Sequence, residues 1–325
     1  MAAAREFAAP QIVDLRQLRV EDLEPLLLEE TEYWQRLLSW DFRPSADLVR
    51  RFIRMRSLAG YALLHGNRIV GFVYYICEER KGLIGDLYLA RDFADSSYEN
   101  LLLAAALRAL WTTPLIERVE SQLLMLSQEA RERLPFPAHL RTYKRDYMVI
   151  DLDRLREMAP IYSPAIYETW HEKDQEQAAR LIAKGYATHI DAEINDQYRS
   201  VSGARQFLSN LVQYPGCGSF FQPGSLVALD PVTGRLLGVS LASLVALDVG
   251  HVTQICVDPA VQGRGVGFEL MRRSMEAMCQ RGCRRATLTV TSTNWGAIRL
   301  YERMGFVTER TFDALVWDAV PERRI

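Results

Sequence analysis

The sequence predicts an α/β (α+β) fold built as two tandem domains, each a mixed, mostly antiparallel central sheet flanked by helices. The chain has 325 residues, which is long for one domain and comfortable for two. In each half, short apolar runs typical of strands alternate with segments of helical periodicity, in a similar order. We place the boundary near Ala159, which gives domains 1–158 and 159–325.

The second half has the more complete series of elements. Pro231 and Gly234 are placed as a tight turn between strands requires, and Gly282 is suited to end the long helix before it. The expected strands cover 166–171, 225–230, 236–245, 251–257 and 285–291, followed by two more from Phe306 and from Ala314. The expected helices cover 174–187, 201–214, 265–281 and 295–304.

The first half repeats this plan as far as its fourth strand. The expected strands begin at 13–15 and continue at 60–64, 68–77 and 83–89. The expected helices cover 20–38, 46–55 and 98–111. The similar order indicates that both halves adopt the same kind of fold.

The most informative segment is the loop Gln262-Gly263-Arg264-Gly265-Val266-Gly267, between a strand and a helix. A glycine-rich turn at a helix start points several backbone N–H groups at one spot, and the helix dipole adds positive charge there. The spacing fits neither a P-loop nor a dinucleotide fingerprint that opens a βαβ unit. We therefore expect a site for another phosphate-containing ligand.

This loop resembles the pyrophosphate loop of the GCN5-related N-acetyltransferase (GNAT) superfamily, written Q/R-x-x-G-x-G/A. Gln262, Gly265 and Gly267 fill its three fixed positions. The segment Asn294–Phe306 resembles the N-x-x-A-x-x-L-Y-x-x-x-G-F motif of the same superfamily. Either motif alone is a weak signal, and the two together in this order are a strong one.

The resemblance implies acetyl-CoA as co-substrate and a V-shaped gap between the fourth and fifth strands of the second domain. It implies direct transfer to an amine in a ternary complex, with the Val257 N–H facing the thioester oxygen and Tyr301 acting as general acid. A tyrosine that only packs its helix against the sheet is the alternative. The implied cofactor-binding residues are Ile255, Cys256, Val257, Gln262, Gly263, Arg264, Gly265, Val266, Gly267, Asn294 and Tyr301.

The general base is less well defined by the sequence. Glu193 lies in the acidic loop between the first two helices of the second domain, where the superfamily often builds its acceptor pocket. His251, at the start of the fourth strand, titrates in a range suited to proton uptake. We consider both as candidate bases, with Asp191 and Asp196 as further acidic groups, and Tyr198 as a possible part of the pocket wall.

In the first half, the position of the glycine loop is taken by Ala90–Ser97. This segment has no glycine, and its two aspartates, Asp92 and Asp95, would repel a pyrophosphate. The first half therefore resembles a degenerate copy of the same domain that is not catalytic. An unrelated α+β domain is the alternative.

Composition narrows the classes of partner and the cellular location that we expect. The net charge of −2 gives no electrostatic case for nucleic acid or an acidic membrane, and no apolar run reaches membrane-spanning length. The five cysteines form no C-x-x-C pair and no metal site, and residues 1–7 lack a signal-peptide core, so we expect a cytoplasmic protein without metal. We expect a monomer or homodimer acting on an amine of a small molecule or peptide. A non-catalytic acyl-CoA sensor is the alternative function.

Overall fold

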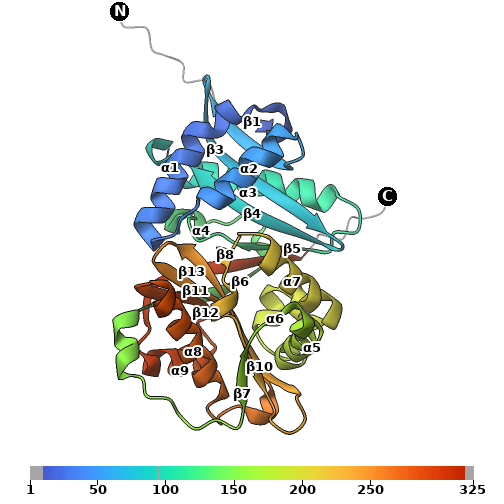
Figure 1. The fold of residues 1–325 in the computed structure, drawn as a ribbon. Coiled ribbons are helices and arrows are strands. Elements are labelled where there is room, and N and C mark those ends of the chain that lie inside the picture. Colours follow the sequence, from blue (N-terminus) through green and yellow to red (C-terminus); the bar gives the residue numbers. More distant parts are fainter. Residues whose placement is uncertain (1–9, 94, 319–325) are drawn as a thin grey trace, which may run out of the picture. The chain divides into compact units, whose positions relative to one another are not determined.

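The computed structural model describes residues 10–93 and 95–318, so the signal-peptide expectation for residues 1–7 lies outside the described part (Figure 1). The chain forms two compact units. Among the described residues, unit 1 contains 10–36, Phe42–Tyr143 and 312–318. Unit 2 contains Leu37–Asp41 and Lys144–Thr311.

The units do not coincide with the predicted ranges 1–158 and 159–325. In unit 1 the final strand, β13 (Val307–Asp318), pairs with β5 (Arg118–Gln122) from the first half of the chain. In unit 2, β6 (Leu140–Asp151) pairs with β12 (Arg285–Thr291) from the second half. These pairs join residues more than 100 positions apart, and hydrophobic periodicity carries no signal for such pairing.

The sheet of unit 1 has the strand order β1-β2-β3-β4-β5-β13. Its pairs are antiparallel except for β4 with β5. Helices α1 and α2 cover one face of this sheet and α3 covers the other. The other strands are β1 (Gln11–Asp14), β2 (Gly60–His65), β3 (Arg68–Glu78) and β4 (Lys81–Leu89). The helices are α1 (Val20–Leu38), α2 (Arg43–Arg54), α3 (Ser96–Thr112) and the short α4 (Gln128–Arg131).

Unit 1 buries a pair of carboxyl groups between α1 and β4. Glu30 is fully buried and Asp86 is 7% exposed. Burial raises the pKa of both, and the charge of Asp86 raises the pKa of Glu30 further. The Trp34 indole N–H donates to Glu30 Oε1 at 3.2 Å. The two carboxyl groups therefore hold their protons to a higher pH than solvent-exposed carboxyl groups do.

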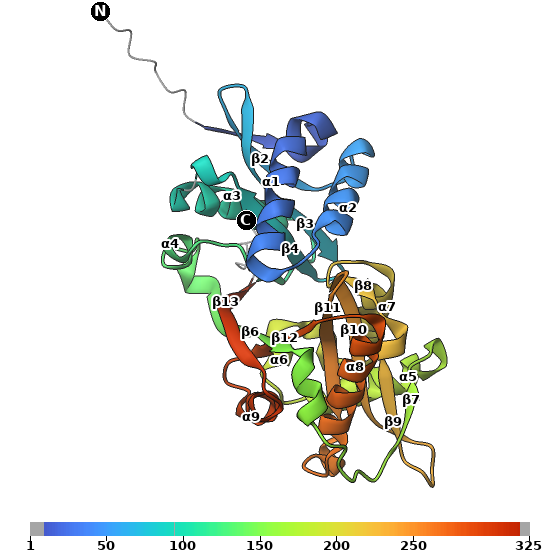
Figure 2. The same cartoon turned by 60° about the vertical axis from the view of Figure 1, so that its left-hand side comes forward.

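The sheet of unit 2 has the order β6-β12-β11-β10-β9-β7, with β8 beside β10. Only β11 and β12 pair in parallel. Helices α5 and α7 pack on one face, and α8 and α9 on the other (Figures 1 and 2). The other strands are β7 (Ile166–Thr169), β8 (Ser219–Phe220), β9 (Leu226–Leu229), β10 (Leu236–Ala246) and β11 (Val249–Val257). The helices are α5 (Gln175–Tyr186), α6 (Asp191–Ile194), α7 (Val201–Gln213), α8 (Val266–Arg281) and α9 (Trp295–Met304).

The predicted class of fold and the order of elements in the second half are confirmed. Helix α8 ends at Gly282, whose φ of 99° is left-handed, as the glycine indicated. The two strands predicted from Phe306 and Ala314 are one continuous strand, β13. Within the described part of the chain, no helix combines the length and the hydrophobicity that crossing a bilayer requires.

Candidate active site

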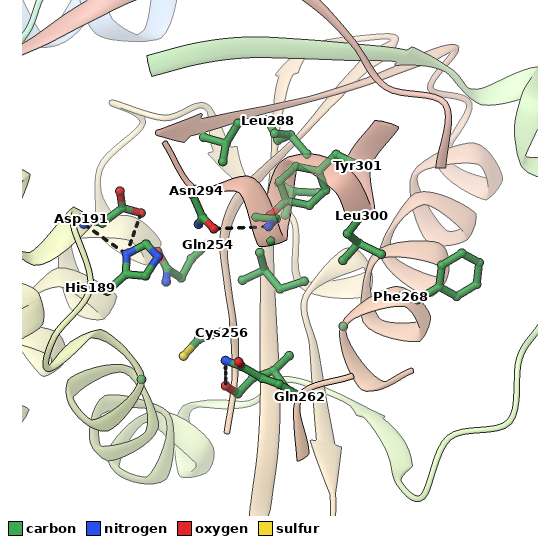
Figure 3. Close-up of a pocket in the computed structure, with 18 of the residues that line it drawn as sticks. His189, Asp191, Gln254, Cys256, Gln262, Phe268, Leu288, Asn294, Leu300 and Tyr301 are labelled. Carbon is green, nitrogen blue, oxygen red and sulfur yellow. Dashed lines mark hydrogen bonds and ion pairs between the residues drawn. The ribbon is translucent and has the colours of Figure 1, made fainter. Parts of the chain in front are cut away.

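The parallel strands β11 and β12 of unit 2 separate after four paired positions. Val249–Val252 pairs with Arg285–Leu288, and both strands then continue without a partner in each other. A cavity of about 760 Å³ opens in this gap, lined by the second halves of both strands (Figure 3). The predicted V between the fourth and fifth strands of this domain is therefore present.

The open edge of β11 presents backbone groups to the cavity. The Asp258 N–H donates to the Leu237 carbonyl of β10 at 2.8 Å. Because an antiparallel strand alternates the direction of its N–H groups, those of Ile255 and Val257 face away from β10. Both residues line the cavity. The strand thus offers unpaired donors at the depth where a ligand would lie in the gap.

The glycine loop closes one end of the cavity. Gly263 and Gly265 have φ values of 75° and 84°, which glycine adopts without the penalty of a side chain. Gly267 also lines the cavity, and Gln262 Nε2 donates to the Val257 carbonyl at 3.3 Å. Val266, in contrast, is buried in the core. Arg264 does not line the cavity.

Helix α8 starts directly at this loop. Its first intrahelical bond runs from the Glu269 N–H to the Gly265 carbonyl, so the preceding N–H groups have no acceptor within the helix. No side chain caps this end. Around Gly263 a Cβ would meet no atom within 4 Å. The loop therefore offers open space, free donors and the positive end of a dipole, which is the donor set that a pyrophosphate requires.

Asp258 anchors the end of β11 beside the loop. Its side chain is 2% exposed and accepts from Lys184 Nζ and Arg235 Nη1, each at 2.9 Å. Burial opposes ionisation, but the bonds from Lys184 and the Ala260 N–H, with the two cations, hold the pKa below its usual range. Asp258 follows directly after the strand expected at 251–257, and the structure adds this anchoring role.

Tyr301 and Asn294 line the cavity at the end away from Gln262 (Figure 3). The Asn294 side chain caps α9, accepting from the Ala297 N–H at 3.2 Å. Tyr301 is 6% exposed. Burial, and secondarily the charge of Asp191, raise the pKa of Tyr301, so its hydroxyl keeps its proton at neutral pH. A phenol in this state can donate a proton but cannot act as a base.

Comparison with known proteins identifies this arrangement. Residues 190–306 match the model of the Acetyltransferase (GNAT) family. This part of the chain is a domain of the GNAT superfamily. The match covers the glycine loop, both strands of the gap and α9. This GNAT chain is therefore an acetyltransferase, and its family implies acetyl-CoA as the acetyl donor.

Individual relatives agree with this assignment. A mycothiol acetyltransferase of Acidimicrobium ferrooxidans is 26% identical over 274 residues, covering 80% of this chain and 83% of the relative. One from Mycobacteroides abscessus is 37% identical over 95 residues, which is 28% of this chain and 32% of that protein. The N-alpha-acetyltransferase MAK3 of Arabidopsis thaliana is 38% identical over 58 residues, 18% of this chain and 30% of that protein.

Solved structures show the same fold over nearly the whole chain. A GCN5-related N-acetyltransferase from Sphaerobacter thermophilus has a TM-score of 0.67 at 16% identity, covering 95% of this chain and 96% of its own. A tandem GNAT protein from the clavulanic acid biosynthesis pathway has a TM-score of 0.60 at 16% identity, covering 96% and 99%. The family model matches only the second half, whereas the fold likeness extends over both units.

Across the gap from Tyr301, this GNAT enzyme has a polar end formed by Asp191 (Figure 3). Asp191 is the carboxylate among the described residues that line the cavity. It accepts a hydrogen bond from Thr291 Oγ1 and lies 3.7 Å from Arg145 Nη1. Its side chain and that of Arg145 are each 13% exposed. A carboxylate that is mostly buried, held and open to the cavity is suited to bind a cation.

A chain of hydrogen bonds stiffens the wall beside Asp191. The Tyr198 hydroxyl donates to Gln254 Oε1 at 3.1 Å, and Gln254 Nε2 donates to the Tyr186 oxygen at 2.9 Å. The Tyr186 hydroxyl in turn donates to the Ile255 carbonyl at 3.2 Å. Both tyrosine hydroxyls therefore have a defined acceptor for their protons, so these tyrosines are positioned by the fold rather than free to transfer protons.

His189 also lines the cavity, but its geometry does not suit a base. Its Nδ1 accepts from the Asp191 N–H at 3.1 Å and lies 3.7 Å from Asp191 Oδ2. The two contacts imply different protonation states of Nδ1. The hydrogen bond is shorter and its donor always carries its proton, so we assign Nδ1 as unprotonated. The neutral ring then carries its proton on Nε2 and has no free lone pair.

The two residues predicted as general bases lie elsewhere. Glu193 does not line the cavity and forms an ion pair with Arg199 at 2.8 Å. His251 is 5% exposed, hydrogen-bonded to Thr287 Oγ1 at 2.8 Å, and its ring is stacked on that of Tyr147. Burial lowers the pKa of His251 to about 4. Neither position supports the expected role.

Cys256 lines the cavity without being a nucleophile. Burial raises the pKa of its thiol to about 12, so the reactive thiolate is absent at neutral pH. A Cβ on Gly185 of α5 would lie 2.7 Å from its sulfur. The small side chain of Cys256 therefore lets α5 approach the strand closely.

Proposed function

We propose that this enzyme transfers the acetyl group of acetyl-CoA directly to a primary amine of a small molecule or peptide, with both substrates bound together in unit 2. The observation that carries the proposal is that one cavity joins the open edge of β11, the glycine loop and Tyr301. These are a strand edge for an extended chain, an anion site and a proton donor. In acetyl-CoA, the pantetheine chain matches the strand edge, the pyrophosphate matches the anion site, and the acetyl thioester matches the proton donor.

Binding is assigned to backbone groups. We assign the pyrophosphate to the N–H groups at the start of α8, next to Gly263 and Gly265, and the pantetheine chain to the outward N–H groups of Ile255 and Val257. Gln262 supports the strand through its bond to the Val257 carbonyl. Asn294 holds the start of α9 at the other wall of the gap.

Three groups of the protein are assigned to the chemistry. The Val257 N–H donates to the acetyl carbonyl oxygen as it gains negative charge. Tyr301 donates its proton to the departing thiolate. The ammonium form of the acceptor loses two protons on becoming an amide. One replaces the proton given by Tyr301, and the other goes to solvent.

Asp191 is assigned to the acceptor amine in place of Glu193 and His251. A free amine with a pKa of about 10.4 is mostly protonated at pH 7, and removing that proton costs roughly 4 kcal/mol. Asp191 attracts the cation into the cavity, and Arg145 and Thr291 hold the carboxylate in place. Relatives named mycothiol acetyltransferase make mycothiol-related amines the first acceptors to test.

Unit 1 is proposed to be a non-catalytic copy. Its β4 and β5 also pair in parallel at four positions only. The helix that follows, α3, is capped by Asp95, whose carboxylate accepts from the Ser97 N–H at 2.8 Å. The side-chain carboxylate of Asp95 thus occupies the start of α3, whereas the corresponding position before α8 is Gly265. Between β5 and β6 unit 1 has the four-residue α4 in place of α9.

Calorimetric titration with acetyl-CoA, followed by a thiol-release assay over pooled amines, tests the proposal. One site per chain and turnover with one pool are expected. Binding without turnover on any pool of amines or peptides would favour the non-catalytic sensor. Two sites per chain would contradict the role given to unit 1, and no binding would contradict the site.

A further inference from the structure

The segment 158–165, which we call the linker segment, runs from the end of β6 and its short 3₁₀ helix to β7 of unit 2. It is the green loop that leads to β7 in Figure 1. Neither sequence motif includes it, and the family match begins after it, at residue 190. Its residue Ile161 nevertheless lines the cavity.

A buried carboxylate holds the linker segment against α8. The Ile161 N–H donates to Glu269 Oε1 at 2.8 Å. Glu269 is 1% exposed and also accepts from Arg272 and Arg273. Although burial opposes ionisation, the bonds from Arg272 and the Ile161 N–H keep the pKa of Glu269 low. The linker segment is therefore fixed by a charge-assisted hydrogen bond rather than lying loosely on the surface.

The linker segment also touches the glycine loop itself. A Cβ placed on Gly265 would lie 2.9 Å from Ile161 Cδ1 and 3.0 Å from the Tyr162 carbonyl oxygen. Any side chain at position 265 would push against this segment. The absence of a side chain at Gly265 thus serves two purposes, since it permits the left-handed backbone and it admits the linker segment beside the phosphate-binding loop.

The side chain that follows Ile161 is left in solvent. Tyr162 is 91% exposed and Ile161 is 44% exposed. The exposed ring has no packing role in the fold. Tyr162 follows Ile161, which lines the cavity, and its backbone carbonyl lies beside Gly265 of the loop assigned to the pyrophosphate. The part of CoA beyond its pyrophosphate is a 3′-phosphoadenosine, whose planar base gains by stacking on an aromatic ring.

We propose that Ile161 and Tyr162 form a binding surface for the adenine base of the acyl donor, with the Tyr162 ring stacking on the base. The inference rests on the proposed use of acetyl-CoA in unit 2 and assigns the adenine end of that ligand. It makes the linker segment, rather than only the glycine loop and α9, part of the donor site.

The test compares two donors and four proteins by calorimetry. The donors are acetyl-CoA and S-acetyl-4′-phosphopantetheine, which keeps one phosphate of the pyrophosphate but lacks the second phosphate and the 3′-phosphoadenosine. The proteins are the wild type, Tyr162→Ala, Tyr162→Phe and Tyr214→Ala. Tyr214 is a matched control because it is a half-exposed tyrosine that does not line the cavity.

Loss of one stacked ring weakens nucleotide binding by at least about fivefold, so Tyr162→Ala should raise the Kd for acetyl-CoA by about 5- to 10-fold. Its Kd for the donor without adenosine should not change. Tyr162→Phe keeps the ring and should bind as the wild type does, as should Tyr214→Ala.

Two results overturn the inference. One is an unchanged Kd of Tyr162→Ala for acetyl-CoA, and the other is an equal rise for both donors, which would indicate a distorted loop. If the wild type binds no acetyl-CoA, the proposed function itself fails. If the wild type binds and Tyr162→Ala binds equally well, only the assignment of adenine fails.

Discussion

The anion site at the start of α8 gives the sharpest prediction, because one position there accepts a matched pair of substitutions. Gly265→Asp and Gly265→Asn introduce side chains of equal size. Both residues tolerate the left-handed region better than other non-glycine residues do. Both must displace Ile161 and the Tyr162 carbonyl equally. The two variants therefore differ in one negative charge beside the assigned pyrophosphate.

The size of the difference follows from Coulomb's law. With about 5 Å between the new carboxylate and one unit of phosphate charge, and an effective dielectric constant of about 40, the repulsion is about 1.7 kcal/mol. That is about 15-fold in Kd, and more if both phosphates contribute. Gly265→Asp should therefore bind acetyl-CoA about 10- to 100-fold more weakly than Gly265→Asn. The difference should shrink as salt is raised, since exposed charges are screened.

Calorimetry at two salt concentrations measures this difference, and Gly234 provides the control. Gly234 also has a positive φ, 67°, and open space around it, but it lies in a turn and does not line the cavity. Gly234→Asp should lower the free energy of unfolding by about 1–2 kcal/mol without changing Kd. Equal affinities of Gly265→Asp and Gly265→Asn would refute the assignment of an anion to this loop.

Three further predictions concern the chemistry and unit 1. Tyr301→Phe should lower kcat about 10- to 100-fold with little change in the KM for acetyl-CoA, and an unchanged kcat would reject the acid role. Asp191→Asn should raise the KM for the amine at least tenfold while leaving acetyl-CoA binding intact, and unchanged amine kinetics would remove Asp191 from the acceptor site. In unit 1, the raised pKa values of Glu30 and Asp86, about 6 for Asp86, mean that the contribution of this pair to stability is fully present below about pH 4 and is lost as pH rises through those values. The free energy of unfolding should fall by on the order of 1–3 kcal/mol between pH 5 and 8, and by less in Glu30→Gln. Denaturant titrations at several pH values measure this, and an equal dependence on pH in both proteins would contradict this account.

Parts of the site that are contiguous in sequence could be predicted from it. The glycine loop and the segment from Asn294 to Phe306 each carry their chemistry at fixed spacing, and the structure brings Gln262, Gly265, Asn294 and Tyr301 to one cavity. Local rules suffice there because a strand, a turn and a helix start form the anion site without help from distant residues.

The polar end of the cavity could not be predicted in the same way. Arg145 comes from β6, in the first half of the chain, and reaches Asp191 only because β6 pairs with β12. His251 was attractive because of its residue type, but the sequence could not show that Trp40 and Tyr147 enclose it. A weak signal existed for Gln254, a polar residue in an apolar strand, which the sequence analysis did not use.

The two units show how little is needed to change what one position in a fold can bind. Both α3 and α8 follow the strand that leads into a V, and both leave N–H groups free at their first turn. At α3 the residue before the helix is Asp95, which accepts one of those N–H groups and places a negative charge over the dipole. At α8 it is Gly265, which accepts none and adds no charge. A carboxylate cap stabilises a helix by about 1 kcal/mol, and here it does so by occupying one of the donors that a phosphate would use. The first unit thus gains helix stability from the same groups that the second leaves open for its ligand.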